Sequence, residues 1–190
     1  MIPAFNIHGV VPPVRPGAPG HSDERAPYPT DMLAFSQHFG NTPERRVILR
    51  GLLDMRAALL SSGITDGFQW LDGSFVEDVE RLRTRPPGDI DVVTFAVLGD
   101  AAAQHARIQG APALFDPDQC KVAYHVDHYF LGTDGGIDET LVNRVSYWYS
   151  MWAHQRDTNR WKGFVTPSLS SNDVDARAWI DKQDAVRGGP

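Results

Sequence analysis

The chain has 190 residues and a mass of 21.1 kDa, a length that suits one domain with its own hydrophobic core. Its formal net charge of −6 argues against non-specific binding of duplex DNA, which needs a basic surface. The single cysteine, Cys120, excludes an internal disulfide and is expected to be a small core residue. Since the chain has no apolar run of membrane-spanning length and no secretory leader pattern, we expect a cytoplasmic protein.

The first part of the chain is expected to be extended. Residues 11–30 are too rich in proline and glycine for a helix or a central strand, so residues 1–30 are predicted to form an N-terminal arm that is laid over the surface or partly disordered. Asp31 is suited to cap a short helix that continues through Phe39.

Thr42 and Pro43 are typical of a helix start, with threonine as N-cap and proline at the first helical position. The helix that follows is predicted to end at Gly63. It carries a core-facing stripe of apolar residues, Ile48, Leu52, Met55 and Leu59.

The rest of the chain alternates between strand and helix patterns. Strands are predicted at residues 68–71, 89–97, 121–131 and 163–169, and helices at residues 74–79, 100–109 and from about 173. A further helix follows Gly135-Gly136, with an apolar stripe of Ile137, Leu141, Val145, Trp148 and Trp152. Residues 81–88 (RLRTRPPG) are predicted to form a basic loop. We therefore expect an α/β (α+β) fold in which helices pack against a mixed sheet, as a single domain over residues 1–190.

Two carboxylates separated by one residue, Asp89 and Asp91, begin the second predicted strand. Residues i and i+2 of a strand point to the same face, so the two side chains would project side by side. Because Ile90 and Val92 indicate a central strand, two unpaired acids there would be costly without a cation. Hard divalent cations prefer oxygen ligands, so the pair predicts a metal site.

Gly73 and Ser74 follow the first predicted strand, where a helix is expected to begin. Glycine lets a phosphate approach the backbone closely, and the exposed N–H groups of a helix start favour an anion. The step alone is a common turn, and its place before the two acids makes it a candidate phosphate site.

A third acid, Asp127, lies in the middle of the third predicted strand and is the candidate third metal ligand. It could instead pair with an arginine or accept a hydrogen bond from His125. A zinc site made by His125 and His128 is not expected, because strand alternation places them on opposite faces.

Positive charge for a triphosphate could come from several basic residues near the predicted site. Lys162 is the first candidate because structured residues flank it, ahead of Arg81, Arg83, Arg85, Arg156 and Arg160. The aromatic run at residues 147–152 could stack a base, although its helical spacing makes Trp148 and Trp152 core residues first.

Together, Gly73-Ser74, Asp89-Ile90-Asp91 and the later Asp127 resemble the nucleotidyltransferase superfamily typified by DNA polymerase β. The resemblance covers about 60 residues in the middle of the chain, and the spacer between Ser74 and Asp89 is slightly long for that family. It implies a nucleotidyltransferase-like fold and a site that binds Mg²⁺ or Mn²⁺ through Asp89, Asp91 and Asp127. Gly73, Ser74 and Lys162 would then bind the phosphates of a nucleoside triphosphate such as ATP.

The chain also resembles a bacterial family of small nucleotidyltransferase-like proteins over most of its length. The segments that carry this likeness are residues 2–13, 45–64, 67–80, 89–95, 124–130 and 161–165. Relatives of this fold modify proteins, RNA or antibiotics, and some act in toxin–antitoxin or phage-defence systems. The resemblance thus implies a protein or RNA acceptor, with a partner protein or a second copy of the chain supplying the acceptor surface.

Three functions follow as hypotheses. The first is transfer of a nucleoside monophosphate to an acceptor with release of pyrophosphate. The second is a catalytically silent binding, antitoxin or regulatory module with the same fold. The third is a metal-dependent phosphohydrolase, which would release inorganic phosphate instead.

Overall fold

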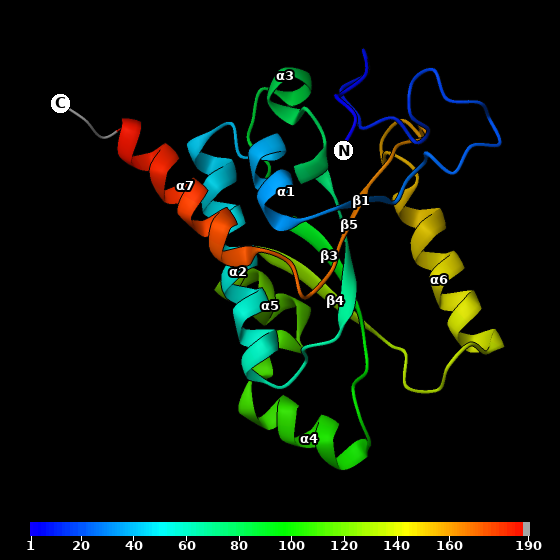
Figure 1. Cartoon of the computed structure of the whole chain (residues 1–190), viewed down its shortest axis with the longest axis vertical. Coiled ribbons are helices and arrows are strands. Elements are labelled where there is room, and N and C mark those ends of the chain that lie inside the picture. The colour runs from blue at the N-terminus through cyan, green and yellow to red at the C-terminus, as the bar shows by residue number, and fades with distance from the viewer. Residues whose placement is uncertain (188–190) are drawn as a thin grey trace.

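The computed structural model describes residues 1–187 and contains one five-stranded mixed sheet (Figure 1). The strands are β1 (Tyr28–Thr30), β2 (Gly67–Asp72), β3 (Ile90–Ala96), β4 (Val126–Gly132) and β5 (Val165–Pro167). Their order across the sheet is β1-β5-β2-β3-β4. The pairs β1–β5 and β3–β4 are parallel, and β2 is antiparallel to both β3 and β5.

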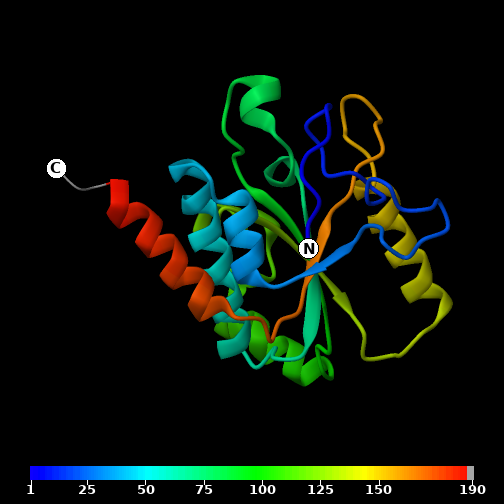
Figure 2. The ribbon, with the colours of Figure 1, turned by 45° about the horizontal axis from the view of Figure 1, so that its top comes forward.

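Among the described residues, seven α-helices pack around this sheet, which agrees with the predicted mixed α/β class. They are α1 (Met32–Phe39), α2 (Pro43–Ser61), α3 (Val79–Arg83), α4 (Ala101–Gly110), α5 (Pro117–Tyr124), α6 (Glu139–Trp152) and α7 (Asp173–Arg187). The same part of the chain forms two single 3₁₀ turns, η1 (Ser74–Val76) and η2 (Pro112–Leu114). Helices α1, α2, α5 and α7 lie on one side of the sheet, and α6 stands apart on the other (Figures 1 and 2). No helix among residues 1–187 combines the length and the apolar character needed to cross a membrane.

The first two helices begin where the sequence predicts. The Asp31 side chain accepts a hydrogen bond from the Ala34 N–H, and the Thr42 hydroxyl accepts one from the Arg45 N–H. The apolar stripe of α2 is buried in the core, and Gly63 follows the helix with a φ of +82°.

A chain of buried polar side chains crosses the helix-covered part of the sheet. Arg56 Nη1 donates to Gln69 Oε1 (2.5 Å), and Gln69 Nε2 donates to Thr94 Oγ1 (2.9 Å). His128 completes it, with Nε2 2.8 Å from Thr94 Oγ1 and Nδ1 3.0 Å from the Leu114 carbonyl. Because a carbonyl only accepts, Nδ1 carries the proton and Nε2 accepts from the threonine. Burial lowers the pKa of His128 to about 4, so the ring is neutral at pH 7.

The predicted strand at residues 121–131 is wrong in its first half. Residues up to Tyr124 belong to α5, and His125 ends that helix with a φ of +57°. The helix begins with Asp116 as N-cap and Pro117 at its first position, a start signal that the strand-like residues after it obscure. Asp127 and His128 do lie on β4.

The segment after Gly73 also differs from the prediction. The helix expected at residues 74–79 is only the single 3₁₀ turn η1, and residues 79–83 form α3, which takes up the start of the predicted basic loop. Ile137 precedes α6 and is exposed, because Asp138 caps the helix that begins at Glu139. The N-terminal arm supplies the unpredicted edge strand β1, which pairs with β5.

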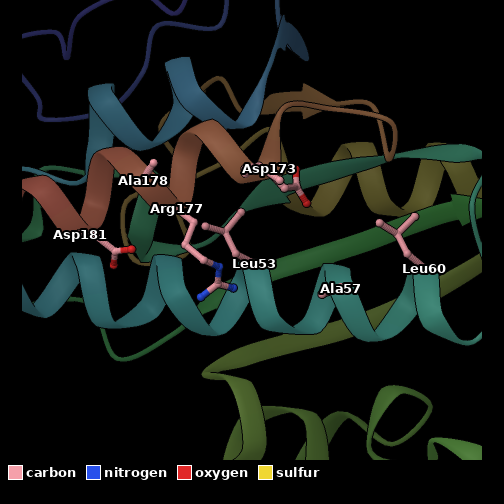
Figure 3. Close-up of a pocket in the computed structure, with 8 residues that line it drawn as sticks. Leu53, Ala57, Leu60, Asp173, Arg177, Ala178 and Asp181 are labelled. Atoms are coloured by element: carbon pink, nitrogen blue, oxygen red, sulfur yellow. The ribbon is translucent and has the colours of Figure 1, made fainter.

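A cavity of about 430 Å³ separates α2 from α7 (Figure 3). Leu53, Ala57 and Leu60 of α2 give it an apolar wall, and Arg177 of α7 lines it while pairing with Asp54 at 2.5 Å. None of the residues predicted to carry chemistry lines this cavity.

Candidate functional site

A larger cavity, of about 850 Å³, lies between the sheet and α6. It falls within the size range of small-molecule sites. The six residues predicted to bind the metal ion or the phosphates all line it: Gly73, Ser74, Asp89, Asp91, Asp127 and Lys162. The fold therefore brings together positions that are up to 89 residues apart in the chain, from Gly73 to Lys162.

Strand register places three carboxylates across three neighbouring strands. Parallel pairing sets Asp91 of β3 opposite Asp127 of β4, and antiparallel pairing sets Asp72 of β2 opposite Asp91. Side chains at directly opposed positions share a face of the sheet. Asp72 was not nominated from the sequence, although an acid that ends an apolar strand just before a glycine is a signal that could have found it.

Asp91 is the most perturbed of these acids. Burial raises its pKa to about 7, and the negative charges of Asp72, Asp89 and Asp127 add to the rise, while Lys162 opposes it. The negative charge around this carboxyl therefore exceeds the positive charge that the nearby lysines supply. The donor chemistry therefore suits a hard cation with oxygen ligands.

Asp89 is held by a residue from another element. Its Oδ2 lies 2.5 Å from Lys121 Nζ of α5, and this contact raises the pKa of the lysine. Within residues 1–187, no group of three or more histidine, cysteine, aspartate or glutamate side chains is arranged closely enough to hold a metal ion. Metal ligation by Asp89, Asp91 and Asp127 thus stays a prediction that requires their side chains to converge.

Gly73 is packed directly against the central acid. It has a φ of +81°, and a Cβ added there would lie 2.5 Å from Asp91 Oδ2. Only glycine fits this position. Ser74 and Phe75 begin η1, where N–H groups have no partner within the turn. No other hydrogen bond in the described part of the chain uses them. A single 3₁₀ turn has little of the dipole expected of a longer helix, so any anion here would rely on these N–H groups and the serine hydroxyl.

Lys162 is buried, with only 3% of its side chain exposed. Its Nζ lies 3.0 Å from Asp72 Oδ1 and 3.0 Å from Glu77 Oε1, and it donates to the Gly73 carbonyl at 3.3 Å. The 3.0 Å approach makes Lys162 the cation of an ion pair with the buried Asp72 carboxylate. Burial raises the pKa of Asp72 to about 6. Lys162 is thus engaged by two acids and a carbonyl, and its contact with a triphosphate stays a prediction.

The wall that α6 forms across from the acids is aromatic. Trp148 of α6 lines it and contacts Tyr129, which lies beside Asp127 on the same face of β4, with the two ring centroids 4.9 Å apart. Tyr147 and Met151 line the same wall and are largely exposed, whereas Trp152 is buried as the stripe predicts. Apolar side chains left uncovered beside a charged floor are typical of a ligand site.

The other nominated side chains fall into two groups. Arg83, Arg85 and Arg156 line the cavity, whereas Arg81 and Arg160 do not. Cys120 is buried in the core, where burial raises its pKa to about 12, as expected of an inert thiol.

Comparison with known proteins assigns the chain to one family. A family of unknown function, DUF6932, matches residues 3–167. The chain belongs to the DUF6932 family. No curated protein and no solved structure matches it. The DUF6932 match contains every residue that lines the larger cavity and excludes α7, so the candidate site is wholly within the family's own segment.

The DUF6932 site therefore has an acidic floor, a glycine-serine turn, an aromatic wall and a partly basic rim. Asp72, Glu77 and Lys121 take part in it and were missed from the sequence, because their partners come from distant elements. The site thus offers ring faces and charged groups to a ligand, and carboxylate oxygens of the kind that a divalent cation prefers.

Proposed function

We propose that this protein is a metal-dependent nucleotidyltransferase that transfers a nucleoside monophosphate from a nucleoside triphosphate to an acceptor hydroxyl. The observation that carries the proposal is the register of β2, β3 and β4, which sets Asp72, Asp91 and Asp127 side by side next to the Gly73-Ser74 turn. Gly73-Ser74, Asp91 and Asp127 belong to the pattern by which the chain resembles DNA polymerase β, and we propose a fold of that kind.

Asp89, Asp91 and Asp127 would hold the divalent cation. The raised pKa of Asp91 supports this, since it indicates negative charge that the nearby lysines do not fully balance. When bound, Mg²⁺ or Mn²⁺ would neutralise charge on the triphosphate. In the reaction the acceptor oxygen bonds to the α-phosphorus, the bond from that phosphorus to the bridging oxygen breaks, and pyrophosphate leaves. Asp127 would accept the proton of the acceptor hydroxyl.

The remaining cavity residues would bind and orient the nucleotide. Gly73 leaves room for a phosphate to approach the backbone, and Ser74 offers its N–H and its hydroxyl. Trp148 and Tyr129 offer ring faces for a base. These contacts position the α-phosphate beside the acids, which is how most phosphoryl-transfer enzymes achieve their rate.

A catalytically silent binding module is the second candidate. The observation that favours it is the ion pair between Asp89 and Lys121, which already balances the charge of one nominated metal ligand. Such a protein would bind a nucleotide without turning it over, and would act as an antitoxin or a regulatory partner.

The test follows the labelled α-phosphate. Purified protein is incubated with each α-labelled NTP and Mg²⁺ or Mn²⁺, alone and with cell lysate, and covalent label and pyrophosphate are measured. We expect both from the wild type and from Asp66→Ala, an exposed control, and neither from folded Asp91→Ala. Nucleotide binding without pyrophosphate would favour the silent module, and activity in Asp91→Ala would refute the site.

A further inference from the structure

Arg45, on the buried side of α2, reaches the segment that follows the glycine-serine turn. We propose that Arg45 is the positioning residue of the Gly73-Ser74 turn, holding its backbone in the shape that receives the triphosphate. The inference rests on the proposed function for its consequence in catalysis, but the contacts themselves stand without it.

The guanidinium of Arg45 is 2% exposed and nearly saturated with hydrogen bonds. Nη1 donates to the Phe75 carbonyl at 2.7 Å, and Nη2 donates to the Glu77 carbonyl at 2.6 Å. Nε and Nη2 also make a bidentate pair with Glu80 at 2.6 and 2.8 Å. The Arg45 Cζ lies 5.2 Å from the centre of the Phe75 ring.

These contacts fix the orientation of the turn through its peptide planes. In a trans peptide the C=O and the following N–H point in opposite directions, so a held carbonyl also orients the next N–H. Arg45 holds two carbonyls from the α2 side, and Lys162 holds the Gly73 carbonyl from the cavity side. The N–H of Ser74 shares its peptide plane with the Gly73 carbonyl, which Lys162 holds. Arg45 fixes the next part of the turn, because the Phe75 carbonyl shares its plane with the Val76 N–H that closes the turn onto the Gly73 carbonyl.

An arginine is needed because the task requires a planar fork. A guanidinium can bond two carbonyls and both oxygens of a carboxylate at once, whereas a lysine ammonium is a single point with three donors. Arg45→Lys therefore keeps the charge and loses the geometry.

Arg46 is the matched control. It follows Arg45 on the same helix and is equally buried, at 2% exposure. Its guanidinium contacts Asp184 Oδ1 at 2.5 Å and the Gly40 carbonyl at 3.1 Å, towards α7 and away from the turn. Arg46→Lys should thus lower stability as Arg45→Lys does, without changing the turn.

The experiment compares the two lysine variants in the full chain by hydrogen exchange and by NTP kinetics. We expect Arg45→Lys to speed exchange at the amides of residues 73–80 by about tenfold relative to Arg46→Lys, at equal intervals below each melting temperature. We also expect an NTP KM about tenfold higher, with kcat changed less than about threefold. Glu80→Gln removes the charge that holds the Arg45 guanidinium, at a position that is only half-buried. It should therefore raise the exchange rate and the NTP KM as Arg45→Lys does, but by smaller factors. This variant takes the place of Arg45→Lys if Arg45→Lys does not fold.

Equal exchange in the two lysine variants would overturn the inference, and so would faster exchange at residues 73–80 with an unchanged KM. A wild type that neither binds nor turns over any NTP would refute the proposed function instead. The exchange result would then still decide whether Arg45 holds the turn.

Discussion

Replacing Asp91 with asparagine should stabilise the protein when divalent cations are absent. The pKa of this carboxyl is raised from 3.8 to about 7 by burial and by the charges of Asp72, Asp89 and Asp127. Because the pKa of Asp91 is higher in the folded protein than in the unfolded chain, the contribution of Asp91 to folding stability is fully present below pH 3.8. This contribution is lost as the pH rises through about 7. Each pKa unit corresponds to about 1.4 kcal/mol, which sets an upper bound of about 4 kcal/mol on the cost at pH 8.

Urea unfolding followed by tryptophan fluorescence in EDTA measures this cost. We expect the free energy of unfolding of Asp91→Asn to be about 2–4 kcal/mol higher than that of the wild type at pH 8, because asparagine does not ionise. Near pH 4 the two values should be similar. Asp66→Asn, at an exposed position, should change stability by less than about 0.5 kcal/mol at both pH values. A variant that is no more stable than the wild type at pH 8, or that differs equally at both pH values, would refute the reasoning.

Three further predictions concern the same region and the core. Gly73→Ala should lower the free energy of unfolding in urea by about 1–3 kcal/mol, because the new Cβ would lie 2.5 Å from Asp91 Oδ2 and the residue has a φ of +81°. Gly88→Ala should be nearly neutral, because a Cβ there would lie in open space. Equal effects would contradict this. Lys162→Met should cost about 3–5 kcal/mol, because it leaves two buried carboxylates without their cation; a loss under about 1 kcal/mol in the same assay would be inconsistent with that role. Burial lowers the pKa of His128 from 6.5 to about 4, so the unfolded chain takes up the proton at a higher pH than the folded protein does. We therefore expect the free energy of unfolding to fall by about 3 kcal/mol as the pH falls from 6.5 to 4. A stability difference between the wild type and His128→Gln that does not change with pH would argue against this.

Much of the architecture could be predicted because its signals are local. The caps at Asp31 and Thr42 and the stripe of α2 lie within a few residues of the structure they specify. The start of α5 was missed because Val122 and Tyr124 favour a strand locally, while the Asp116 cap and the packing of the helix decide otherwise.

The sequence by itself determined which residues could supply chemistry: an acid pair at the start of an apolar strand, a glycine-serine step, and a later acid on another strand. Only the tertiary structure decided how they meet. Asp127 comes to lie opposite Asp91, 36 positions earlier, because the parallel pairing of β3 with β4 needs a long crossover that carries α4 and α5. The same packing brings Lys121 to Asp89 and encloses Lys162 between two acids. Strand register and side-chain pairing between distant elements are not local properties of the chain, and in this protein they decide the charge of the site.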